Sequence, residues 1–207
     1  EQADPKYPYQ QISGMPYGVQ RGYIALGLFR DDQDVESSPS QFGTVRPGDI
    51  KYKDVNGDGV IDSYDKVVGV GHPNVPEIVY GFGLNIEYKG FYASVFFQGT
   101  GNCSVLLGGN TPEGWYPFAW GVDQSSYRTF ALDRWTESNP SQNVLMPRLH
   151  KDNANNANNQ VASTWWLRNG GFLRLKNMEF GYQLPKQFLK KFNVQAARIY
   201  VMGYNLA

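Results

Sequence analysis

The chain has 207 residues, enough for one or two ordinary domains, and its 19 basic residues balance its 19 acidic residues, which leaves no basic field to attract nucleic acid. Aromatic residues make up 15% of the chain and glycine contributes 23 residues, yet no continuous apolar segment approaches the ~18 residues that a membrane helix requires. The composition therefore excludes transmembrane helices but not a transmembrane β-barrel, and the single cysteine, Cys103, excludes an internal disulfide.

The first predicted element is a weak strand from Tyr17 to Phe29, and a long polar connection over residues 30–76 follows it. Within that connection, segment 54–65 reads DVNGDGVIDSYD and carries side-chain oxygens at the spacing of an EF-hand-type calcium loop. A hard cation takes six to eight oxygen ligands, and Gly59 permits the sharp turn that lets alternate residues face it. The predicted ligands are Asp54, Asn56, Asp58, the carbonyl of Val60, Asp62 and Asp65.

Two features of this loop differ from a helix-loop-helix hand. Asp65 stands at position 12, where such hands carry a longer bidentate Glu, although dockerin-type calcium loops tolerate Asp there. The preceding segment GDIKYK alternates like a strand and has no helical stripe. The pattern predicts a structural Ca²⁺ site, and the alternative is a metal-free loop shaped by Asx turns, in which side chains accept hydrogen bonds from the backbone.

The clearest strands form a hairpin predicted over residues 77–100. From Tyr80 to Tyr88 apolar side chains alternate with small or polar ones, and after the turn Lys89-Gly90 the alternation continues from Phe91 to Phe97. Each strand has about 9 to 12 residues, which is long for a soluble sheet and close to what a tilted strand needs to cross a bilayer.

A second long connection is predicted over residues 101–170. Its segment GWYPFAW gathers aromatic rings that can stack on a sugar or anchor a protein partner, or else form a small core of the loop itself. The ligand-binding candidates in it are Trp115, Tyr116 and Trp120. Trp165 and Trp166 directly precede the next strand, so we expect them in an aromatic girdle at a membrane interface.

A second hairpin is predicted over residues 171–207. Its strands GFLRLKNMEFGYQL and ARIYVMGYNLA flank a connector in which Pro185 can begin a short helix. The alternation changes phase between Leu175 and Met178, which predicts a β-bulge near Lys176 and Asn177. Long and short connections thus alternate along the chain, as they do in outer-membrane barrels with long extracellular loops and short periplasmic turns.

Five segments occur in a characteristic order: PGDIKYKDVNGDGVID, YGFGLNIEYKGFYASVFFQGTGN, RWTESNP, TWWLRNGGFLRLKNMEFGYQLPK and RIYVMGYNL. Together they resemble the C-terminal portion of SusC/RagA-type TonB-linked outer-membrane transporters, over roughly residues 22–206. The resemblance implies a mainly β fold in which antiparallel up-and-down strands form part of a large transmembrane β-barrel. Residues 1–207 are then a C-terminal part of the barrel, residues 30–76 and 101–170 are extracellular loops, and the two hairpins belong to the wall.

The resemblance also implies a function in nutrient uptake. A SusC/RagA-type transporter imports glycan or peptide oligomers across the outer membrane of a Gram-negative bacterium, with a SusD-type surface lipoprotein as its lid and the TonB system as its driver. No plug, TonB-contacting segment or closing terminal strand is recognisable, so we expect a fragment that meets TonB only through an N-terminal part outside this sequence. The expected contacts of the chain itself are outer-membrane lipid, the lipoprotein and the oligosaccharide or peptide substrate.

No catalytic constellation is visible, so we do not expect an enzyme. His72 and His150 are far apart in unrelated contexts, and Cys103 has no base beside it in the sequence. The alternative to a transporter is a soluble calcium-dependent carbohydrate-binding or adhesion module on a β-sandwich. The apolar face from Tyr80 to Tyr88 distinguishes the two, because it faces lipid in a barrel and a second sheet in a sandwich.

Overall fold

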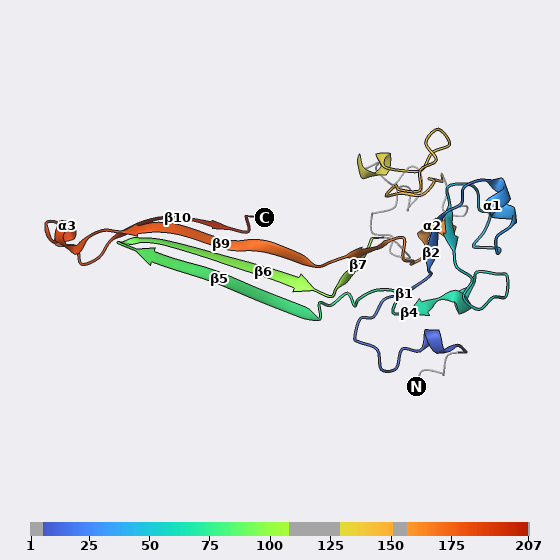
Figure 1. Ribbon diagram of the computed structural model, residues 1–207, viewed down its shortest axis with the longest axis horizontal. Coiled ribbons are helices and arrows are strands. Elements are labelled where there is room, and N and C mark those ends of the chain that lie inside the picture. The colour runs from blue at the N-terminus through green and yellow to red at the C-terminus, as the bar shows by residue number, and fades with distance from the viewer. Residues whose placement is uncertain (1–5, 108–128, 151–156, 207) are drawn as a thin grey trace. The chain divides into compact units, whose positions relative to one another are not determined.

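The computed structural model describes residues 6–107, 129–150 and 157–206, which divide into two compact units. Unit 1 contains the described residues within 1–75 and 104–169, and unit 2 contains those within 76–103 and 170–207. The fold is mainly β, and the named strands pair antiparallel in both units (Figure 1). Across these described ranges, none of the helices is long and apolar enough to cross a membrane.

Unit 2 is a four-stranded sheet with the order β10-β9-β6-β5, and Figure 1 shows its long strands side by side. Its elements are β5 (Ile78–Tyr88), β6 (Phe91–Gly101), β9 (Phe172–Gln183), α3 (Lys186–Lys190) and β10 (Arg198–Tyr204). Both predicted hairpins are therefore present. Over the residues that the structure describes, the sheet is open and not closed into a barrel, with β5 and β10 at its edges.

The turn between β5 and β6 has the geometry that its two residues favour. Lys89 and Gly90 have φ angles of 49° and 87°, the left-handed conformation at both central positions that a type I′ turn requires. The carbonyl of Gly90 accepts a hydrogen bond from the N–H of Gln183 at 2.7 Å. The β5–β6 turn and the end of β9 consequently lie at the same end of the sheet, which we call the short-turn end.

The predicted β-bulge is confirmed on β9. Phe96 lies opposite Asn177 and Phe97 lies opposite Leu175, so Lys176 is the extra residue. The Lys176 ammonium donates to Oε1 of Gln98 at 2.9 Å. Because the bulge inserts one residue, the side chains of Leu175 and Met178 point to the same face despite their odd spacing.

Unit 1 is built from short elements. They are β1 (Arg21–Gly22), β2 (Ala25–Leu28), α1 (Asp32–Glu36), β3 (Ile50–Tyr52), β4 (Val67–Val68), β7 (Ser104–Leu106), α2 (Ala157–Gln160), β8 (Leu167–Asn169) and the 3-10 turns Pro8–Gln10, Ser63–Asp65 and Thr129–Leu132. The single strand predicted from Tyr17 to Phe29 is wrong. It is two short strands, of which β1 pairs with β4 and β2 with β3, and neither joins the sheet of unit 2.

An aromatic core holds unit 1 together. Its buried residues are Tyr23, Leu28, Ile50, Tyr52, Ile61, Trp135, Met146 and Trp166. Trp166 is only 2% exposed and donates from Nε1 to the carbonyl of Asn159 at 2.9 Å, and Trp165 packs partly buried against the same core. The predicted girdle role of Trp166 is therefore wrong, because burial against strands far away in the sequence removes its ring from the surface. Trp165 keeps part of its surface exposed, and its predicted role stays a prediction.

A buried carboxylate joins three segments of unit 1. Asp49 is 1% exposed. Its Oδ1 atom lies 2.7 Å from Nε2 of His150 and accepts a hydrogen bond from Nδ2 of Asn159, also at 2.7 Å. Its Oδ2 accepts from the N–H of Arg46 at 2.8 Å. These contacts give His150 a structural role, since a buried carboxylate requires hydrogen-bond donors.

Candidate functional site

The sheet of unit 2 has one face without charge, which we call the apolar face. In an antiparallel sheet, residues directly opposite each other share a face, so the strand register defines its members. They are Ile78, Tyr80, Phe82, Leu84, Ile86 and Tyr88 on β5; Phe91, Ala93, Val95, Phe97 and Gly99 on β6; Leu173, Leu175, Met178, Phe180 and Tyr182 on β9; and Ile199, Val201 and Gly203 on β10. Many of these side chains are exposed, such as Leu84 at 57% and Val201 at 75%.

The opposite face, which we call the polar face, carries every charged residue of the four strands. These are Glu87, Arg174, Lys176, Glu179 and Arg198. The hydroxyl of Tyr92 donates to Glu179 at 2.8 Å, and its ring covers the position where a Cβ on Gly181 would stand. The sheet therefore has one face without charge, whereas the other carries the charged groups together with some exposed apolar side chains, such as Val79, Phe96 and Met202.

The strand length suits a membrane wall. Strands β5 and β6 have 11 residues each. At about 3.4 Å per residue such a strand is about 37 Å long and covers about 26 Å of bilayer depth when tilted by about 45°. That depth matches the apolar band of about 25 Å in outer-membrane barrels.

The predicted calcium loop 54–65 lies in unit 1 and is held by its own side chains. Asp54 accepts from the N–H groups of Gly57 and Gly59 at 2.6 and 2.8 Å, and Asp58 accepts from that of Val60 at 3.0 Å. Gly57 and Gly59 have φ angles of 77° and 84°. The hydrogen bonds to Asp54, first that from Gly59, hold the pKa of its carboxyl below the ordinary value.

These contacts fit the metal-free alternative for the loop. Asp62 accepts from the N–H of Tyr64 at 2.7 Å and Asp65 from those of Val55 and Asp62 at 2.7 and 2.9 Å, so the carboxylates face backbone donors. Within the part of the chain that the structure describes, no group of three or more His, Cys, Asp or Glu side chains is arranged to hold a metal ion. The conformation is thus explained by Asx turns alone, and the calcium site stays a prediction.

The aromatic ligand candidates cannot be placed in this site. Trp115, Tyr116 and Trp120 lie outside the described residues. Their predicted role in ligand binding stays a prediction.

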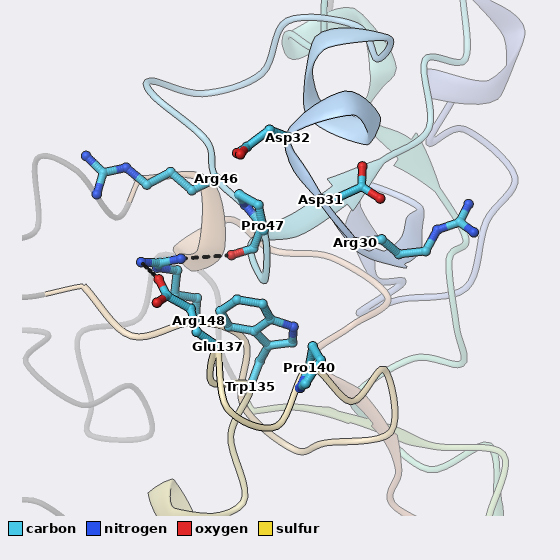
Figure 2. Close-up of a pocket in the computed structure, with 9 residues that line it drawn as sticks. All are labelled: Arg30, Asp31, Asp32, Arg46, Pro47, Trp135, Glu137, Pro140 and Arg148. Atoms are coloured by element: carbon cyan, nitrogen blue, oxygen red, sulfur yellow. Dashed lines mark hydrogen bonds and ion pairs between the residues drawn. The ribbon is translucent and has the colours of Figure 1, made fainter.

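A pocket of about 620 Å³ opens in unit 1, and Figure 2 shows the residues around it. Its lining comprises Arg30, Asp31, Asp32, Arg46, Pro47, Trp135, Glu137, Pro140 and Arg148. The Arg148 guanidinium lies 5.5 Å from the Trp135 ring centre and donates to the carbonyl of Pro47 at 3.2 Å and to Oε1 of Glu137 at 3.0 Å. Cations, carboxylates and an aromatic ring thus meet in a volume typical of small-ligand pockets.

This pocket was not predicted from the sequence. Its residues come from three separate segments, the start of α1, the approach to β3 and residues 135–148. The one available signal was the segment RWTESNP, which contains Trp135 and Glu137.

Curated relatives of known class cover nearly the whole chain. TonB-dependent receptor P3 of Formosa agariphila is 26% identical over 193 residues, which is 93% of this chain. TonB-dependent receptor P26 of the same organism is 30% identical over 197 residues, or 94% of this chain. In both cases the chain spans only 18% of the relative's length. No protein-family profile matches the chain.

Solved structures share the fold. The RagAB peptide importer in the "open-open" state aligns over 99% of this chain with a TM-score of 0.59 and 19% identity, and the alignment covers 21% of its own chain. The RagAB peptide transporter aligns over 91% of this chain with a TM-score of 0.61 and 22% identity, and the alignment covers 18% of its own chain. At this identity the likeness concerns the fold.

Proposed function

We propose that this chain is part of a SusC/RagA-type TonB-dependent transporter and that the sheet of unit 2 forms a segment of the wall of its outer-membrane β-barrel. The apolar face contacts lipid and the polar face lines the interior. The protein acts in import across the outer membrane of a Gram-negative bacterium, and it is not an enzyme.

One observation carries this proposal. Residues of the apolar face on four strands are apolar or glycine, whereas the strands place their charged residues on the other face. Burying apolar area is worth about 25 cal/mol per Å², so a water-exposed face of this kind is strongly favoured to leave water. Transmembrane barrels alternate apolar-out and polar-in in this way.

The imported material is an oligomer of peptide or sugar. The RagAB structures are named as a peptide importer and a peptide transporter, which supports peptide. The pocket of Figure 2 supports a small polar ligand group, because its lining combines arginine side chains, carboxylates and an aromatic ring. A SusD-type lipoprotein acts as the outer partner, and the TonB system drives the import.

The sandwich alternative lacks support. It requires the apolar face to pack on a second sheet, and the described residues of unit 2 form one sheet whose apolar face is exposed. If calcium binds, its role is to stiffen the loop 54–65 and present the neighbouring residues, because coordination replaces conformational freedom without chemistry.

A pair of arginine substitutions tests the wall assignment. In membranes of cells that make the natural protein, Leu84→Arg on the apolar face should lower the free energy of unfolding of the barrel by about 2 to 4 kcal/mol, whereas Asn85→Arg on the polar face should change it little. Heat modifiability of the assembled protein on gels and urea titration in the membrane measure this. Equal losses from the two variants would sink the assignment.

A further inference from the structure

The connection between β9 and β10 carries an exposed aromatic pair beside a cluster of lysines. Phe188 and Phe192 are 52% and 64% exposed, and their ring centres lie 5.5 Å apart. They stand four residues apart, which places them on one side of the helical turn. Aromatic side chains this exposed at the end of a sheet call for a covering surface.

The charge of this connection has one sign. Residues 184–197 contain Lys186, Lys190 and Lys191 and no acidic residue, and all three lysines are exposed. Lys186 and Lys190 lie two positions from the phenylalanines, roughly on the opposite side of the helical turn. Lys89 of the β5–β6 turn adds a fourth exposed lysine at the same short-turn end of the sheet.

The connection is an ordered structure and not a loose loop. Leu184 donates its N–H to the carbonyl of Ala197 at 3.0 Å, and the turn that follows α3 ends in Asn193 with a φ of 53°. The N–H of Val194 donates a hydrogen bond to the carbonyl of Leu189 at 3.2 Å, as in a Schellman cap. Leu189, at 4% exposure, is the one buried residue from 185 to 196, so the turn presents the phenylalanines and lysines in a fixed arrangement.

We propose that this segment, residues 185–194, is an interfacial anchor that docks on anionic phospholipid headgroups at the short-turn end of the sheet. Phe188 and Phe192 enter the boundary between headgroups and acyl chains, and the lysines pair with lipid phosphates. The apolar face reaches this end of the sheet as a ring cluster of Tyr88, Phe91 and Tyr182, with the last two 4.4 Å apart, so the proposed lipid-facing surface extends to the end at which the anchor lies. This inference rests on the proposed membrane-wall function.

The test uses the natural protein reconstituted into phospholipid vesicles, in a background where Cys103 and any cysteine outside these 207 residues are replaced by serine. A polarity-sensitive fluorophore is attached to Phe192→Cys, and separately to Phe188→Cys so that one phenylalanine remains in each variant. Labels at Leu84→Cys and Asn85→Cys report the two faces of β5. Vesicles of phosphatidylcholine alone are compared with vesicles that also contain phosphatidylglycerol.

We expect the labels at 188 and 192 to emit at shorter wavelength and to be quenched by lipids brominated near the headgroup, more strongly with phosphatidylglycerol. The double variant Lys190→Gln/Lys191→Gln should abolish that increase, since each lysine contributes about fivefold to binding an anionic surface. The matched variant Lys53→Gln/Lys66→Gln in unit 1 should leave it intact. High salt should reduce it through screening.

The outcomes distinguish failure of the anchor proposal from failure of the proposed membrane-wall function. If the labels at 188 and 192 are exposed to water while the label at 84 is shielded by lipid, the anchor proposal is wrong and the proposed barrel wall is retained. Equal quenching in both kinds of vesicle would overturn the role of the anionic headgroups. Equal water exposure at 84 and 85 would overturn the proposed function and the anchor with it.

Discussion

The Asp65 carboxylate accepts a hydrogen bond from the N–H of Val55 at 2.7 Å and so joins the two ends of the acidic loop. Asp65 is fully buried, and its second oxygen accepts from the N–H of Asp62 at 2.9 Å. The residue that the spacing marked as the last metal ligand therefore acts as the internal clasp of the loop.

Removal of this clasp should destabilise unit 1. Asp65→Ala leaves the N–H groups of Val55 and Asp62 without their acceptor, and we expect the free energy of unfolding to fall by about 2 to 3 kcal/mol. Urea titration followed by the fluorescence of the core tryptophans measures the loss. Asp58→Ala is the control, because water can replace its exposed carboxylate, and a loss as large as that of Asp65→Ala would contradict the clasp.

Calcium binding is tested on the same loop. If the predicted site exists, calorimetry should show saturable Ca²⁺ binding, and the melting temperature should rise with Ca²⁺ and fall with chelator. Asp58→Ala should remove both effects, because it deletes a predicted ligand while sparing the clasp. Flat titrations and unchanged melts in folded protein would leave the loop with its Asx turns alone.

Acid stability should depend on the ion pair between Asp34 and Lys51. The two groups are 2.7 Å apart, and the hydrogen bond from Lys51, followed by that from the N–H of Arg30, holds the pKa of Asp34 below its ordinary value. A depressed pKa in the folded state means that the stabilisation is present above the unfolded pKa, near 4, and is lost as the pH falls through the folded pKa.

The variant Asp34→Asn should flatten this part of the pH profile. Between neutral pH and about pH 4 the wild type should be more stable than the variant, and below the folded pKa of Asp34 the difference should shrink. Urea titrations at a series of pH values measure it, with Asp32→Asn as the control on the same helix. A difference that stays constant down to the lowest pH would contradict the linkage.

Local patterns in the sequence were sufficient for the two hairpins of unit 2, whereas the pairing of β6 with β9, which joins them into one sheet, leaves no local signal. The turn at Lys89-Gly90 and the bulge at Lys176 follow from residue type and from a change of phase, and both depend on neighbours along the strand. Periodicity alone could not distinguish a membrane-spanning barrel wall from one sheet of a soluble β-sandwich. The resemblance to transporters favoured the barrel wall.

The packing of unit 1 could not be predicted from such local patterns. Trp166 looked like an interfacial ring because it precedes a strand, yet its environment comes from Ile50 and Tyr52, more than a hundred residues earlier. The pocket likewise unites Arg46 with Arg148 across the chain. Contacts of this range are set by tertiary packing and leave no periodic signal.

A glycine pair isolates the packing around this pocket. Gly48 has a φ of 89° and lies against the Trp135 ring, which a Cβ would strike, whereas Gly57 has a φ of 77° and open space around it. Gly57→Ala should cost about 1 to 2 kcal/mol of unfolding free energy from backbone strain alone. Gly48→Ala should add about 1 to 3 kcal/mol from overpacking. Equal losses by urea titration would show that Trp135 yields freely.

The two faces of the sheet should meet different surroundings, lipid on the apolar face and water on the polar face. Single cysteines at positions 82 and 84 to 87 of β5, in the same cysteine-free background, can be tested with a water-soluble maleimide in membranes that contain the natural protein. We predict labelling with period two, in which positions 85 and 87 react and positions 82, 84 and 86 are protected unless detergent is added; position 83 is left as glycine, because a Cβ there would strike the carbonyl of Val95. Uniform reactivity along the strand, or protection of the odd positions instead, would contradict the account.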